Sequence, residues 1–271
     1  MFSILKGLPN LFGQIFQKGE LRVKAIILIV VASLIPLSQL FVIKVFSTMI
    51  MHKKAGLSVW HIVAQFALFF GLYGSTHLIT YWQKTYRVKV FDGAFKVMDT
   101  KNKLKETWQW ALAFELTNLF HMIITAVILI VYFSFVDWRF GILNFAVILA
   151  SLELIAWLYR KHLKDQHKFV DARNKKQHVE NSIRVGSRIR SGEAGTLLSS
   201  AGLVVLLAAL LLLSYTNVLD ASGAVVLFLG LRMQNSNLSG ISGGLMRLAR
   251  AMAYSGQKYD DEDEDEDEDE D

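Results

Sequence analysis

Long runs of apolar residues alternate with shorter polar stretches along most of this 271-residue chain. Six of the runs are about 20 residues or longer, which is the length that an α-helix needs to cross about 30 Å of hydrocarbon. They occupy residues 25–49, 59–82, 110–136, 140–159, 196–215 and 221–246. The pattern therefore predicts an all-α membrane protein with six transmembrane helices, and it does not favour a barrel of strands.

Apolar residues also recur at helical spacing before the first predicted span, at Ile4, Leu5, Leu8, Leu11, Phe12, Ile15 and Phe16. This spacing predicts an amphipathic helix on the cytoplasmic membrane surface, with Pro9 near its start. The two long polar connections, 83–109 and 160–195, contain no proline and little glycine, so we expect the spans to continue as cytoplasmic helical extensions. The predicted domains are an amphipathic segment at 1–23, a six-helix transmembrane domain at 24–258 and an acidic tail at 259–271.

Basic residues are distributed unevenly between the connections. There are four in the N-terminal segment, seven in the connection 83–109, ten in the connection 160–195 and three after the sixth span. The short turns hold only Lys53, Lys54 and Arg139. Lys and Arg are retained on the cytoplasmic side of membranes, so both termini and the long connections are expected there. The expected location is the bacterial cytoplasmic (inner) membrane, with lipid and not nucleic acid as the partner of the basic surface.

Half of the 24 acidic residues form one unbroken run at 260–271. Such a segment repels itself and buries no apolar area, so it is expected to be disordered. It could contact the basic inner surface of the protein, capture a basic partner, or serve only as a solubilising or appended terminus.

Five local segments carry a resemblance to a known family. They are Phe-Glu-Leu-Thr-Asn at 114–118, Asp-Trp-Arg-Phe-Gly-Ile-Leu at 137–143, and the stretches 180–190, 219–226 and 245–256. With the N-terminal amphipathic helix, three short outer loops and two long inner connections, they resemble the transmembrane domain of type I ABC exporters over about residues 1–258. The stretch from Glu180 to the fifth span is shorter than in that family, which predicts a fifth helix without a long inner extension.

The resemblance implies a homodimer or heterodimer that moves substrate by alternating access. Coupling to an ATPase would then involve the inner connections, with the candidate residues Phe91, Phe95, Glu180, Ile183 and Arg184. No G-x-x-x-x-G-K-[ST] phosphate loop occurs in the chain, so we expect neither enzyme activity nor a bound cofactor here. ATP and Mg²⁺ would be bound by a separate ATPase subunit of a split exporter.

Polar groups inside predicted spans are the candidate functional residues, because a charge at the bilayer centre costs about 2.5–3.5 kcal/mol and normally faces a cavity or a partner. Arg232, Gln234, Asn235 and Asn237 cluster on the sixth span and are predicted to line a substrate pathway. The alternatives are a helix end near the interface and hydrogen bonding between helices.

A second hypothesis concerns proton transfer. Glu115, Asn118 and His121 are spaced three residues apart, and Glu153 lies on the next span, so Glu115, His121 and Glu153 form a candidate proton relay. A solvated or structural role for Glu115 is the alternative. The relay would suit a proton-coupled secondary transporter on the same scaffold. A third class is a non-transporting membrane scaffold that recruits partners through its acidic tail. No catalytic residue and no metal site are predicted.

Overall fold

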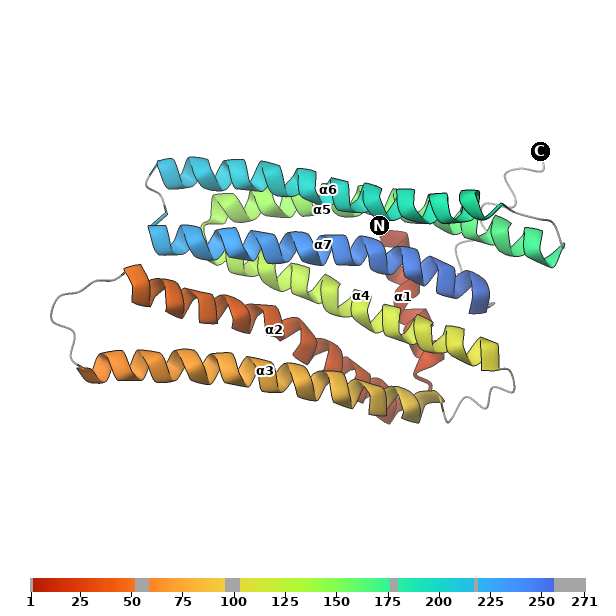
Figure 1. Ribbon diagram of the computed structural model, residues 1–271, viewed down its shortest axis with the longest axis horizontal. Helices are drawn as coiled ribbons and strands as arrows, with labels where there is room; N and C mark the ends of the chain where they lie inside the picture. The colour runs from red at the N-terminus through yellow and green to blue at the C-terminus, as the bar shows by residue number, and fades with distance from the viewer. Residues whose placement is uncertain (1, 52–58, 96–102, 176–179, 217–218, 256–271) are drawn as a thin grey trace.

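The computed structural model describes residues 2–51, 59–95, 103–175, 180–216 and 219–255, and nearly all of these are helical. The helices are α1 (Phe2–Ile15), α2 (Gly19–Met51), α3 (Val59–Phe95), α4 (Lys103–Val136), α5 (Trp138–Asn174), α6 (Asn181–Tyr215) and α7 (Ala221–Ser255). The long helices α2 to α7 run up and down as a bundle, and α1 lies across them in the right-hand half of Figure 1. The all-α prediction is confirmed for the described residues.

Five helices, α2 to α6, are long and apolar enough to cross a membrane within the part of the chain that the structure describes. The sixth predicted span belongs to α7, which is not among them because the polar residues between Arg232 and Ser239 lower its hydropathy. α7 packs against α2, α4, α5 and α6. A helix surrounded by other helices needs fewer apolar side chains than one that faces lipid, and the sixth span stays a prediction.

The helices extend well past the predicted spans. α2 to α7 each contain 33 to 37 residues, and at 1.5 Å per residue they are about 50–55 Å long, against about 30 Å of hydrocarbon. The predicted helical continuation of the spans is therefore confirmed. The prediction that the fifth span lacks an inner extension is wrong, because α6 begins at Asn181, directly after Glu180.

The predicted N-terminal amphipathic helix is present as α1, with Pro9 in its middle and not near its start. Its apolar face is buried against the protein, and Phe12 meets Phe120 of α4 edge-on with ring centroids 5.6 Å apart. The buried residues of this segment are Leu8, Leu11, Phe12, Ile15 and Phe16. The apolar face of α1 therefore covers the protein's own core.

The two ends of the bundle carry different segments. One end, on the right in Figure 1, is called the basic end here, because its segments flank the Lys- and Arg-rich connections. It consists of α1, the last turns of α3, α5 and α7 and the first turns of α4 and α6. The neutral end holds the short α4–α5 turn and the start of α7. This grouping matches the predicted topology, although the side of the membrane on which each end lies stays a prediction.

α3 lies at the edge of the bundle. It packs mainly on α2 and has few contacts with α4. Only 6% of its most apolar 18-residue stretch is buried inside the protein. Its exposed large side chains include Trp60, Phe70, Leu78 and Tyr81. α3 is therefore the least enclosed of the long helices.

The apolar core consists of two clusters with a polar layer between them. One cluster, toward the basic end, includes Leu112, Leu116, Leu119, Ile241, Leu245 and Leu248, and the other includes Leu129, Phe133, Leu227 and Leu231. In the polar layer, Asn144 of α5 and Gln234 of α7 exchange two hydrogen bonds, of 3.3 Å and 2.5 Å. The Asn237 side chain also donates to the Met122 carbonyl at 2.7 Å. These bonds satisfy amides that would otherwise be costly to bury.

Candidate functional site

A cavity of about 400 Å³ lies between α4, α5, α6 and α7 near the basic end, and it is called the basic-end pocket here. The lining residues of each helix recur at helical spacing, so each helix presents one face to the cavity. The stripes are Trp108, Ala111 and Glu115 of α4, His162 and Gln166 of α5, Val185 and Gly192 of α6, and Gly243, Met246, Arg247, Arg250 and Ala251 of α7.

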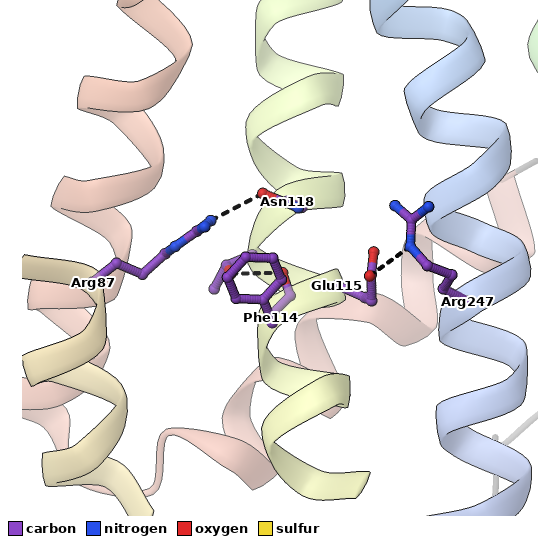
Figure 2. Close-up of polar contacts among 6 residues, drawn as sticks. Arg87, Phe114, Glu115, Asn118 and Arg247 are labelled. Carbon is purple, nitrogen blue, oxygen red and sulfur yellow. Dashed lines mark hydrogen bonds and ion pairs between the residues drawn. The ribbon is translucent and has the colours of Figure 1, made fainter. Parts of the chain in front are cut away.

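An ion pair joins two walls of this pocket. The Arg247 Nε of α7 donates to Glu115 Oε1 of α4 at 2.6 Å (Figure 2). The Glu115 side chain is 13% exposed and that of Arg247 is 53% exposed. Glu115 Oε2 is also buried, and it accepts no hydrogen bond from any described residue. One oxygen of this carboxylate is therefore paired, and the other is enclosed without a hydrogen-bond donor among the described residues.

The remaining polar groups make the pocket both basic and partly aromatic. The Arg250 guanidinium lies over the Trp108 ring, 5.4 Å from its centroid. His162 and Gln166 are buried side chains of α5 at 3% and 4% exposure. Among the described residues, the charged lining of the pocket thus consists of two guanidinium groups and one carboxylate.

A second arginine contacts α4 from the opposite side. Arg87 of α3 donates from Nη1 to Asn118 Oδ1 at 3.0 Å, and its guanidinium carbon lies 3.9 Å from the centroid of the Phe114 ring (Figure 2). Arg87 and His121 also line a cavity of about 10 Å³, which has room for no more than about one water molecule. This second contact is therefore closely packed, in contrast to the basic-end pocket.

The three residues of the predicted proton relay lie in separate contacts. Along an α-helix, an interval of three residues rotates the side-chain direction by about 60° less than a full turn. Glu115 and His121 are six residues apart, so their side chains point in directions about 120° apart. His121 Nδ1 lies 3.4 Å from the Thr125 hydroxyl. Glu153 is exposed and lies 3.8 Å from Arg160. Proton transfer among the three residues stays a prediction.

The predicted pathway residues of α7 point in several directions. Gln234 and Asn237 face α5 and α4 in the polar layer, while Arg232 is exposed. Asn235 is half-buried, and its side-chain oxygen has no hydrogen-bond partner among the described residues. None of the four lines the basic-end pocket, whose first α7 residue, Gly243, lies about two turns beyond Asn237.

The residues predicted to couple to an ATPase fall into two groups. Phe91 is buried at 1% exposure, and Phe95 stacks on Trp110 with ring centroids 4.9 Å apart, so both rings face the protein. Glu180 and Ile183 are exposed at the start of α6. The side chain of Arg184 lies outside the described residues. Coupling through either group stays a prediction.

Several residues of the site were not among the sequence candidates. Arg87 and Arg247 lie just beyond the predicted ends of their spans, where a basic residue indicates only the topology. The spacing of Gly243, Arg247 and Arg250, at four and then three residues, is the signal that could have placed both arginines on one helical stripe. The packing of α5 and α6 around that stripe has no comparable local signal.

No family model matches the chain, and no curated protein matches it significantly. The resemblance to ABC exporters therefore rests on the sequence pattern alone. Within the described ranges, no three His, Asp or Glu side chains are grouped so that they could hold a metal ion.

Proposed function

We propose that this chain is the membrane subunit of a transporter and that the basic-end pocket is the vestibule in which substrate first binds. The observation that supports this proposal is the cavity of about 400 Å³, lined by both charged and apolar side chains, between four long helices of a membrane protein. Protein interiors are close-packed with few voids, and a cavity with mostly apolar walls and a few converging polar groups is typical of a small-molecule site. A cavity that holds Glu115, Arg247 and Arg250 fits such a site.

Opening of the pathway would require α4 and α7 to separate. These helices share the most extensive contact in the bundle, and the Glu115–Arg247 ion pair connects them across the pocket. A substrate that competes for Arg247 would weaken this connection, so binding and opening would be linked. The next group of polar side chains along α7 is the polar layer. It contains Gln234 and Asn237, two of the four predicted pathway residues.

The energy source in this proposal is an ATPase on a separate chain, which would bind ATP and Mg²⁺, while the membrane subunit works as a homodimer or heterodimer. This part rests on the resemblance to type I ABC exporters. Glu180 and Ile183 are exposed at the start of α6, and this surface would contact such a subunit.

The experiment is purification of the chain from its native host, followed by reconstitution into vesicles with and without the proteins that accompany it. A stoichiometric ATPase subunit and ATP-dependent uptake would support the proposal. Loss of uptake in Arg250→Gln, with the ATPase still bound, would assign the defect to the pocket. Vesicles that transport nothing, together with a stable partner that is not an ATPase, would overturn the proposal in favour of a membrane scaffold.

A proton-driven transporter is the second candidate, and the unpaired Glu115 Oε2 favours it because this oxygen could accept a proton inside the pocket. The same vesicles distinguish the two. Uptake that collapses with the proton gradient and is indifferent to ATP would support the second candidate and exclude the first.

A further inference from the structure

We infer that a groove between α1, α2 and α4 binds an anionic phospholipid, with one acyl chain in the groove and the phosphate group at Arg22. The groove, called the α1 groove here, has a volume of about 340 Å³, and its lining includes Phe12, Arg22, Ile26, Val30 and Ile124. It shares no described lining residue with the basic-end pocket. The inference therefore goes beyond the proposed function and does not depend on it.

The walls of the α1 groove suit a hydrocarbon chain. Every described side chain that lines it is apolar except that of Arg22. Phe12 and Ile29 are buried and form the floor, where the Phe12 ring meets Phe120, and the half-exposed Ile26 and Val30 form the rim. Such walls offer no hydrogen bond to water, whereas a hydrocarbon chain gains dispersion contacts along them.

The position of the groove suits a lipid of one leaflet. Its walls on α2 and α4 belong to helices that are long and apolar enough to cross a membrane. Arg22 lies just before the predicted span at 25–49 and eight residues before Val30. The α2 wall is thus about 12 Å long, against about 15 Å for the hydrocarbon of one leaflet. A lipid whose chain lies along this wall has its head group at Arg22.

The guanidinium group of Arg22 is held in place by the end of α1. Its Nε donates to the Phe16 carbonyl at 3.3 Å, and its Nη2 donates to the Gly13 carbonyl at 3.4 Å. The last carbonyls of a helix lack donors within the helix, so Arg22 supplies two of them. Its Nη1 has no hydrogen-bond partner among the described residues, and the side chain is exposed. Nη1 can therefore donate to a phosphate oxygen in a charge-assisted hydrogen bond.

The charges around Arg22 favour a head group that carries no cation. No acidic side chain lines the groove in the described part of the chain. Glu20, the acidic residue nearest in sequence, pairs with Lys24, and Lys18 adds a further positive charge. The ammonium group of phosphatidylcholine would be repelled by Arg22 and Lys18, whereas phosphatidylglycerol brings its phosphate with an uncharged glycerol.

The inference is tested by native mass spectrometry of the full chain, purified in detergent and titrated with phosphatidylglycerol or phosphatidylcholine that have the same acyl chains. The mass added to the protein identifies the bound lipid, and the populations of the bound forms give the affinity of the first site. Phosphatidylglycerol is expected to bind severalfold more tightly than phosphatidylcholine. Equal affinities would overturn the inference.

Charge variants locate the phosphate. Arg22→Gln should weaken binding of phosphatidylglycerol about tenfold, since it removes one hydrogen bond to a charged group. Arg22→Lys should keep the preference for phosphatidylglycerol over phosphatidylcholine. Arg160→Gln, which removes the same charge from an exposed side chain of α5, should leave both affinities unchanged. Equal losses in Arg22→Gln and Arg160→Gln would mean a diffuse attraction to the whole basic surface and would overturn the inference.

Variants that fill the groove locate the acyl chain, and they leave the contacts of Arg22 with the α1 carbonyls untouched. Ile26→Trp places a larger side chain at the rim and should weaken binding of both lipids. Ile27→Trp is the matched control, because Ile27 is 49% exposed against 47% for Ile26 and does not line the groove. Equal binding by these two variants would overturn the inference.

The head group alone provides the last comparison. Glycerophosphoglycerol, which is the head group of phosphatidylglycerol without acyl chains, should not displace the lipid. Displacement at similar concentration would identify Arg22 as a site for water-soluble phosphates and would overturn the assignment of a lipid. None of these measurements involves transport, so their outcome leaves the proposed function to its own test.

Discussion

Two arginines, from helices on opposite sides of α4, contact side chains of this helix. Arg247 of α7 pairs with Glu115, whose side chain is mostly buried, and Arg87 of α3 reaches Asn118 and the Phe114 ring. The exposed Glu153–Arg160 pair, at 3.8 Å, offers a direct comparison. Exposed ion pairs contribute little to stability, whereas removing one partner of a largely buried pair leaves an uncompensated charge.

Arg247→Met is therefore expected to destabilise the protein by about 1–3 kcal/mol, because it leaves the Glu115 carboxylate without its charged donor. Arg160→Met is the control and should change stability by less than about 1 kcal/mol. Both are measured from the midpoint of unfolding, followed by tryptophan fluorescence in detergent. Adding Glu115→Gln to Arg247→Met should recover part of the loss. Equal midpoints for the two single variants would show that burial of Glu115 contributes nothing.

The amide pair in the polar layer makes a second prediction at this scale. Asn144→Leu leaves the buried Gln234 side chain without its partner, and Gln234→Leu does the same to Asn144. The double variant removes both, so it should be less destabilised than the sum of the two single variants. We expect a coupling energy of about 0.6–1.7 kcal/mol, the range for polar pairs between membrane helices. Strictly additive losses in a double-mutant cycle would contradict this.

At the scale of whole elements, glycines set how closely α7 approaches its neighbours. A Cβ built on Gly230 would lie 2.7 Å from Phe133 Cε1 of α4, and one on Gly240 would lie 2.8 Å from Met122 Cε. Small residues let membrane helices pack closely, because no hydrophobic driving force holds them together in lipid. Met122 ends in a flexible chain, but Phe133 is a fully buried ring that has nowhere to move.

Gly230→Ala should therefore cost about 1–3 kcal/mol through overpacking. Gly71→Ala in α3 is the matched control, since nothing lies within 4 Å of its built Cβ, and it should stabilise the helix by up to about 1 kcal/mol. Thermal midpoints of the two purified variants provide the comparison. A Gly230→Ala protein as stable as the parent would mean that α4 and α7 are not in the contact described here.

The whole molecule has two chemically different ends, and its sequence contains no cysteine, so introduced cysteines can report the orientation directly. Lys175, at the basic end, and Tyr215, at the neutral end, are both exposed. A membrane-impermeant maleimide should label Tyr215→Cys in intact cells, and Lys175→Cys only after the cells are permeabilised. The reverse pattern would place the basic end outside.

How far the sequence predicts this architecture depends on the scale. The lengths of apolar runs were enough to predict α2 to α6, because the hydrocarbon thickness sets a minimum helix length that the sequence must satisfy. The direction in which each side chain points was harder to predict from the sequence. Glu115 and Asn118, and likewise Asn118 and His121, are three residues apart, as neighbours on one helix face are. Each interval of three residues leaves an offset of about 60°, so Glu115 and His121 face directions about 120° apart. Phe91 faces inward because it packs on Phe16, just after α1, and on Trp110 and Phe114 of α4, and no local pattern encodes these contacts.

The sparse packing of α3 bears on how the protein is made. Almost all of its contacts are with α2, its neighbour in sequence, so the two helices can enter the bilayer together as a hairpin while the rest of the chain is still being synthesised. α7 is the opposite case, because α2, α4, α5 and α6 all precede it in the chain and together form its surroundings. The pocket between α4, α5, α6 and α7 is therefore completed only when α7 is inserted.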